Sequence, residues 1–175
     1  MQEQLIVLVL GSDKINILSY LAAAASETDC NILDSRQAIY GEDFSLTLIL
    51  EGDVGAIARA EVNISQLCQK HNLLSMMKRT KDHHKQNLVH LADVEFVGVD
   101  AIGVMASITK FFGERGISIN ALRQKLFLEQ HTQVKMLKCK MIVSIPDGTD
   151  IKDVAFEYED HLEKLSLIGT LTEKH

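Results

Sequence analysis

Hydrophobic and polar positions along the first half of the chain change between the spacing of a strand and that of a helix. A short uninterrupted apolar run predicts a strand covered on both faces, whereas apolar residues three and four apart predict one buried helix face. Strictly alternating apolar residues that follow a Gly-Glu-Asp turn predict a half-buried strand paired in a hairpin. The predicted order is strand, helix, strand, strand, helix and strand, over residues 5–10, 15–25, 31–40, 44–50, 57–67 and 73–78.

The second half of the chain repeats the first. Residues 98–119 match residues 11–32 at a constant distance of 87 positions, and the same order of elements follows. A repeat of this length indicates a duplicated domain rather than a short solenoid unit. The identical pairs are Gly11/Gly98, Asp13/Asp100, Ile15/Ile102, Glu27/Glu114 and Ile32/Ile119.

This order predicts an α+β fold of two tandem ferredoxin-like βαββαβ units, in which four antiparallel strands carry two helices on one face. We expect the first domain over residues 1–80, a linker over 81–87 and the second domain over 88–175. Because helices on one face leave the other face bare, the copies must share cover or an edge. A homo-oligomer is one way to do so.

Composition narrows the class of protein. The chain is 46% hydrophobic and 24% charged, and its formal net charge of -6 disfavours a duplex-binding surface, because phosphate contacts require cations. The start Met-Gln-Glu-Gln lacks the basic residues of a signal peptide, and residues 5–10 are too few to cross a bilayer. Three widely spaced cysteines form no readable disulfide or zinc pattern. We expect a cytoplasmic protein that makes no direct contact with nucleic acid or membrane.

Two repeated motifs resemble ACT domains, which are small amino-acid-sensing modules. Residues 11–18 read G-S-D-K-I-N-I-L, and residues 98–105 read G-V-D-A-I-G-V-M. The family pattern carries a glycine inside this turn and another before the next strand. The second copy keeps both as Gly103 and Gly116, whereas the first copy has Asn16 and Asp29. The ACT resemblance implies the ferredoxin-like fold and an amino-acid ligand.

A narrower resemblance covers nearly the whole chain. Residues 30–36 read C-N-I-L-D-S-R, residues 41–44 read G-E-D-F, and residues 77–80 read M-K-R-T. These stretches resemble the family of glycine cleavage system transcriptional repressors. The resemblance implies an accessory regulator without its own DNA-reading helix. Its ligand would be glycine, and its partner a LysR-type activator that it restrains when glycine is scarce.

A receptor for a free amino acid needs clustered N–H donors for the carboxylate and oxygen acceptors for the ammonium group. The turn before each first helix supplies donors, and polar side chains at the start of the next strand supply acceptors. We expect the second copy to hold the ligand, because Asn16 would crowd the approach that Gly103 leaves open. The pocket is expected where one copy's turn meets the other copy. The candidate ligand-binding residues are Asp13, Lys14, Ile15, Asn16, Asn31, Asp100, Ala101, Ile102, Gly103, Val104, Ser118 and Asn120.

Each candidate also has a purely structural interpretation. Asp13 and Asp100 are good helix N-caps, Gly103 is suited to a turn, and Asn31 could bond only its own backbone. Asp34 and Arg36, two apart on a strand, are expected to form a structural ion pair.

No catalytic or metal motif stands out. The basic residues 78–81 are read as a solvated linker, with a partner contact as the alternative, and Asp82, His83 and His84 lack the spacing of a metal site. Cys30 is expected to be a small core residue. We therefore expect a protein that is not an enzyme and needs neither cofactor nor metal. Two other classes stay open: a regulatory subunit that docks on a biosynthetic enzyme, and a structural interaction protein without a ligand.

Overall fold

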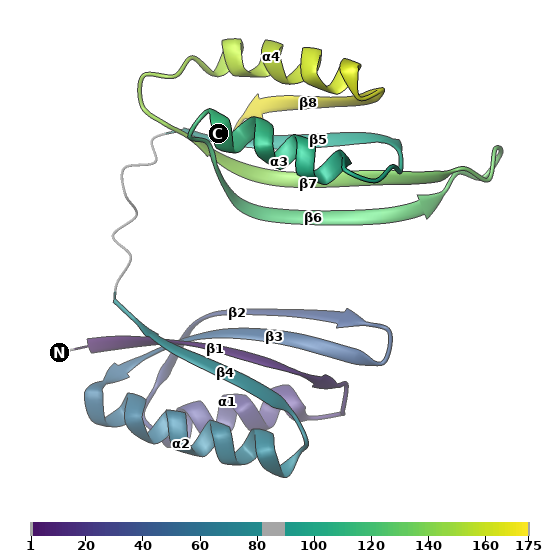
Figure 1. Cartoon of the computed structure of the whole chain (residues 1–175). Helices are drawn as coiled ribbons and strands as arrows, with labels where there is room; N and C mark the ends of the chain where they lie inside the picture. Colours follow the sequence, from purple (N-terminus) through teal and green to yellow (C-terminus); the bar gives the residue numbers. More distant parts are fainter. Residues whose placement is uncertain (1, 82–89, 175) are drawn as a thin grey trace. The chain divides into compact units, whose positions relative to one another are not determined.

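The computed structural model describes residues 2–81 and 90–174, which form two compact units, one on each side of the segment 82–89 (Figure 1). Each unit is described by itself. Of the expected linker 81–87, residues 82–87 lie outside the described residues, so the domain boundaries stay a prediction. No helix in the described ranges has the length and apolar character needed to cross a membrane.

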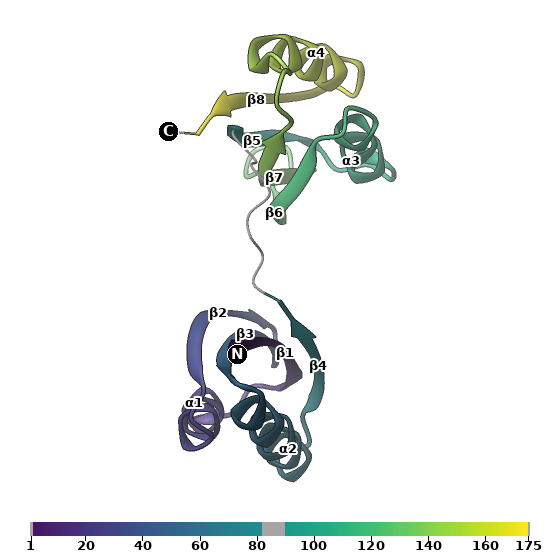
Figure 2. The same ribbon diagram turned by 90° about the vertical axis from the view of Figure 1, so that its left-hand side faces the viewer.

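The first unit is a four-stranded antiparallel sheet with two helices on one face (Figures 1 and 2). The strand order is β2-β3-β1-β4, so the first strand lies in the interior of the sheet. Its elements are β1 (Gln2–Ser12), α1 (Ile17–Glu27), β2 (Asn31–Tyr40), β3 (Asp43–Asp53), α2 (Val54–Lys70) and β4 (Leu74–Thr80).

The second unit repeats this topology with the strand order β6-β7-β5-β8. The predicted pair of ferredoxin-like βαββαβ units is confirmed. The elements are β5 (His90–Val99), α3 (Val104–Glu114), β6 (Ser118–Leu128), β7 (Lys135–Ile145), α4 (Ile151–Lys164) and β8 (Leu167–Glu173).

Each core lies between the sheet and its own two helices. In the first unit, the alternate residues Leu5, Val7 and Val9 of β1 are buried against α1 and α2, whereas Leu8 and Leu10 on the opposite face are 41% and 47% exposed. The prediction that residues 5–10 are covered on both faces was therefore wrong. The helices lie on one face, and none of the residues described in this unit covers the other.

Candidate functional site

The candidate site in each unit is the turn between the first strand and the first helix. Asn16 precedes α1 with φ 71°, and Gly103 precedes α3 with φ 90°, so both lie in the left-handed region. Asn is among the few non-glycine residues that adopt this conformation readily. Asp29 and Gly116 form a second matched pair, with φ 61° and 65°. The first copy therefore keeps the backbone of the family turns although it lacks their glycines.

Asp13 and Asp100 are not helix caps, which was the structural alternative to ligand contact for both residues. The helices begin four residues later, after the left-handed residues Asn16 and Gly103. Instead, the backbone N–H of Asp13 donates to the carbonyl of Glu42 at 2.8 Å, and that of Asp100 donates to the carbonyl of Lys135 at 3.0 Å. These bonds tie each turn to the neighbouring hairpin. Both carboxylates have no partner among the described residues and are exposed.

The first turn of each helix leaves backbone donors unused. No side chain caps α1 or α3. The N–H groups of the first helical residues, Ile17 and Val104, donate to carbonyls in the preceding turn. The next two N–H groups in each helix find no acceptor within the described residues; they belong to Leu18, Ser19, Met105 and Ala106. An unsatisfied helix N-terminus favours a negatively charged group.

The two turns differ in what surrounds them. Lys14 ties the first turn to the end of α2, because its Nζ donates to the carbonyl of His71 at 3.1 Å. The matching residue in the second unit is Ala101, which makes no such contact. Ile15 was predicted to lie on the buried helix face, but it precedes the helix and is 91% exposed, and Ile102 is fully exposed as well. The second turn therefore carries smaller side chains than the first.

The polar residues at the strand starts lie elsewhere in the unit. Asn31 opens β2 opposite Glu51. Asn120 lies in a β-bulge of β6, where its amide nitrogen donates to Ser144 Oγ at 2.5 Å and its oxygen accepts from Ser118 Oγ at 3.4 Å. The hydrogen-bonding groups of Asn120 are therefore occupied within the sheet.

Within one unit, the N–H donors of the turn and the polar side chains at the start of the next strand are too far apart to bind a single glycine. Asn31 lies level with Gln4, since both pair with Glu51, whereas the turn follows Ser12, eight residues further along β1. Eight residues of extended strand span about 26 Å. The second unit has the same arrangement, because Ser118 lies level with the start of β5. The reason is geometric: the intervening helix runs back along the strands, so its two ends lie at opposite ends of the strands. The expectation that one copy's turn meets the other copy stays a prediction.

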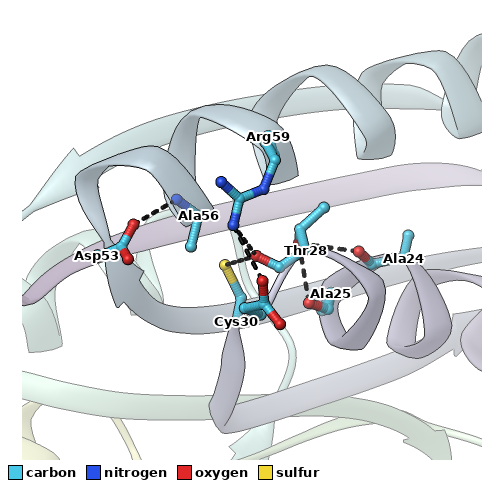
Figure 3. Close-up of polar contacts among 8 residues, drawn as sticks. Ala24, Ala25, Thr28, Cys30, Asp53, Ala56 and Arg59 are labelled. Atoms are coloured by element: carbon cyan, nitrogen blue, oxygen red, sulfur yellow. Dashed lines mark hydrogen bonds and ion pairs between the residues drawn. The ribbon is translucent and has the colours of Figure 1, made fainter.

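A polar network that the sequence did not predict fixes the end of α1 (Figure 3). The Arg59 guanidinium donates to the carbonyl of Thr28 at 3.3 Å and to Asp29 Oδ2 at 3.1 Å. Asp53 accepts from the N–H of Ala56 at 2.7 Å as the N-cap of α2, and this bond lowers the pKa of the Asp53 carboxyl. Cys30 is buried beside this network, as predicted for a core residue. The network joins both helices to the start of β2.

The basic stretch 78–81 is only in part the solvated linker that was predicted, because residues 78–80 belong to β4 and Lys81 follows it. Lys78 and Arg79 belong to β4, and Arg79 donates to Glu61 Oε2 at 2.8 Å and to Glu3 Oε2 at 3.2 Å. The bond to Arg79 holds the pKa of the Glu61 carboxyl below its usual range. Arg79 thus ties β4 to α2 and to β1. The second half of this junction, Asp82 to His84, lies outside the described residues.

The predicted ion pair between Asp34 and Arg36 is confirmed at 3.0 Å on the edge strand β2. Residues 2–81 and 90–174 contain no group of three His, Cys, Asp or Glu side chains placed to hold a metal ion.

Three hollows lie away from the turns. One separates α1 from α2, and another, of about 340 Å³, separates α3 from α4. A third, of about 580 Å³, lies on the open sheet face of the second unit. None of the three is lined by residues of either turn. The alternation of Lys138 and Lys140 between buried residues was the sequence signal that could have pointed to the open face.

Residues 3–78 match the family model of the ACT domain. The chain is 23% identical over 170 residues to the glycine cleavage system transcriptional repressor of Escherichia coli (strain K12), with 97% of this chain and 90% of that relative covered. A crystal structure of a protein assigned as a glycine cleavage system transcriptional repressor superposes with a TM-score of 0.77 at 25% identity, covering 99% of this chain and 98% of the other. A protein of unknown function from Galdieria sulphuraria gives a TM-score of 0.79 at 16% identity, with complete coverage of both chains, and shows the same fold.

Proposed function

We propose that the chain, whose residues 3–78 match the ACT domain family model, senses a small amino acid, with glycine as the first candidate, and regulates transcription through a protein partner. Similarity along 97% of the chain to a protein named as a transcriptional repressor supports this role. The observation that carries the sensing step is the twice-repeated turn: its aspartate and the helix N–H groups that follow find no partner among the described residues.

The turn offers groups for both ends of a zwitterion. The free N–H groups of Met105 and Ala106 would receive the carboxylate at the positive end of the α3 dipole. The carboxylate of Asp100 would accept hydrogen bonds from the ammonium group. Gly103 lets the ligand approach closely, because a Cβ built there meets nothing within 4 Å. The second unit is our preferred site, since Lys14 and Asn16 flank the first turn with larger side chains.

The regulatory step is proposed to run through another protein. The net charge of -6 disfavours independent binding to duplex DNA. A LysR-type activator in the cytoplasm is the partner that the family resemblance suggests. On this proposal the protein is a sensor with no reaction of its own.

Thermal unfolding with added glycine, alanine, serine and leucine tests the sensing step. A ligand at ten times its Kd stabilises the folded chain by about 1.4 kcal/mol, which raises Tm by several degrees. We expect this rise with glycine and its loss in Asp100→Asn. Asp147→Asn, at an exposed position of a different turn, is the matched control and should keep it. Millimolar glycine that changes neither Tm nor the heat of mixing would contradict the proposal.

A mobility-shift assay tests the regulatory step. We expect the chain to bind a purified LysR-type activator on its operator DNA, and glycine to change the affinity of that complex. A salt-dependent shift of the DNA by the chain alone would contradict the proposed route. Recovery of a biosynthetic enzyme without any effect on an activator would favour the alternative of a regulatory subunit.

A further inference from the structure

The open face of the second unit's sheet carries four cations in a square. Arg123 and Lys125 on β6 lie directly opposite Lys140 and Lys138 on β7. All four side chains are exposed, and they point away from the helices, because the intervening residues of β7 form the core. We call these four residues the basic face. Like charges placed directly opposite on neighbouring strands destabilise a sheet, so this arrangement needs a reason outside the sheet.

Neighbouring carboxylates neutralise this charge only in part. Lys140 Nζ lies 3.7 Å from Glu95 Oε2, whereas within the described residues the other three cations form no ion pair. Lysines on an edge strand often protect that strand from pairing with another chain, and this role would explain Lys125 on β6. This explanation fails for β7, because that strand is paired with β5 on one side and with β6 on the other. Lys138 and Lys140 therefore do not protect an edge.

The fold itself does not require these cations. At the corresponding positions of the first unit's sheet, Ser45 and Thr47 occupy the places of Lys138 and Lys140. Ala38 likewise stands where the second unit has Lys125. The two units share a core pattern and differ on their open faces. Arg36 stands where the second unit has Arg123, but it is paired with Asp34, so the three lysines of the basic face are the charges that only the second unit carries.

Apolar and hydroxyl groups border the basic face. The hollow of about 580 Å³ is lined by Arg123 and Lys140 together with the hydroxyls of Thr170 and Thr172. Beyond Lys125 and Lys138, the same face continues into Phe127, which is 37% exposed. Ile168, level with Lys138 across Val97, is 78% exposed. A partner that fits this surface combines negative charge with at least one apolar side chain.

We propose that the basic face docks an acidic segment of a protein partner, whose carboxylates meet the four cations while separate apolar residues of the segment contact Phe127 on β6 and Ile168 on β8. This inference rests on the proposed function, because it supplies the surface through which a sensor could reach its partner. Charge complementarity carries it: an acidic segment would relieve the cross-strand repulsion between Arg123 and Lys140.

Single-stranded nucleic acid fits the same surface less well. Among the described residues of this face, Phe127 alone offers an aromatic ring, whereas sequence-tolerant binding of single strands uses several stacked bases. A small anion also fits less well, since the four charges are spread over two strands and two residue steps instead of converging on one point.

Binding of a synthetic peptide tests the inference. The probe is a twelve-residue peptide of glutamates around a central Leu-Leu pair, titrated into the full chain at low salt and followed by calorimetry and by backbone amide NMR shifts. We expect shifts centred on β6 and β7. The variant Lys125→Gln/Lys138→Gln should weaken binding at least fivefold, and replacing the two leucines by serine should weaken it further.

The matched control is Lys70→Gln/Lys152→Gln, which removes the same charge from exposed helix positions and should bind within twofold of the parent. Equal weakening in both double variants, or shifts located away from β6 and β7, would overturn the inference. Tighter binding of a twelve-residue oligo-dT than of the glutamate peptide would overturn it in favour of nucleic acid. The glycine-dependent rise in Tm should persist in Lys125→Gln/Lys138→Gln. If that rise is absent from the parent as well, the proposed sensing function fails while the docking result stands on its own.

Discussion

Replacing Gly103 by alanine should destabilise the second unit through backbone conformation alone. Gly103 has φ 90°, and a Cβ built on it meets nothing within 4 Å, so no clash contributes. Holding an L-residue in the left-handed region costs roughly 1–2 kcal/mol. Alanine also lowers the conformational entropy of the unfolded chain, which offsets roughly 0.4–1 kcal/mol of this cost. The expected net loss is therefore about 1 kcal/mol.

A glycine-to-alanine substitution within α3 supplies a control, for which we expect a change in stability of the opposite sign. Gly113 lies inside α3 with an ordinary helical φ, and its Cβ position is also open. Alanine is favoured over glycine in a helix interior by about 1 kcal/mol. Gly113→Ala should therefore stabilise the second unit by up to that amount.

Urea and thermal unfolding of the full chain measure both changes, and amide hydrogen exchange assigns them to the second unit. For a domain of this size, 1 kcal/mol corresponds to about 4–8 °C in Tm. The two variants should move Tm in opposite directions. If Gly103→Ala leaves stability unchanged, or if both variants shift it in the same direction, the left-handed helix start is not the constraint that we infer.

Three further perturbations test the cores and the charged junction. Phe112→Ala, at a fully buried position beside Tyr158, should cost about 3–5 kcal/mol in urea unfolding; a loss below 1 kcal/mol would contradict the packing. Arg79→Ala should lower the free energy of unfolding of the first unit at pH 7. This loss relative to the parent should shrink as the pH falls below about 4.5, because protonation of Glu61 removes its interaction with Arg79 in the parent. A loss of stability that does not change with pH would refute this coupling. Burial raises the pKa of the Cys68 and Cys139 thiols, so both should react slowly with a disulfide reagent at pH 8 and rapidly in 6 M guanidinium; fast reaction of the folded chain would show that the cores open.

The order of elements and the core could be read from the sequence because both depend on local periodicity. Alternation in Leu46 and Leu48, and helical spacing in Ile57, Ala60 and Ile64, mark the side chains that the structure buries. The repeat at 87 positions also located both candidate turns. What periodicity could not report was whether the second face of β1 is covered, since an apolar run has the same appearance in either case.

The tertiary structure alone decided how the candidate groups are arranged. The sequence placed aspartates and asparagines near helix and strand starts, but capping depends on φ and ψ, and left-handed residues moved both helix starts beyond Asp13 and Asp100. Contacts between elements determined the distance between the turns and the strand starts, the pairing of Arg79, and the square of cations on β6 and β7. Side-chain spacing along one strand fixes which face a residue occupies, whereas its charged neighbours come from strands that only the folded sheet brings together.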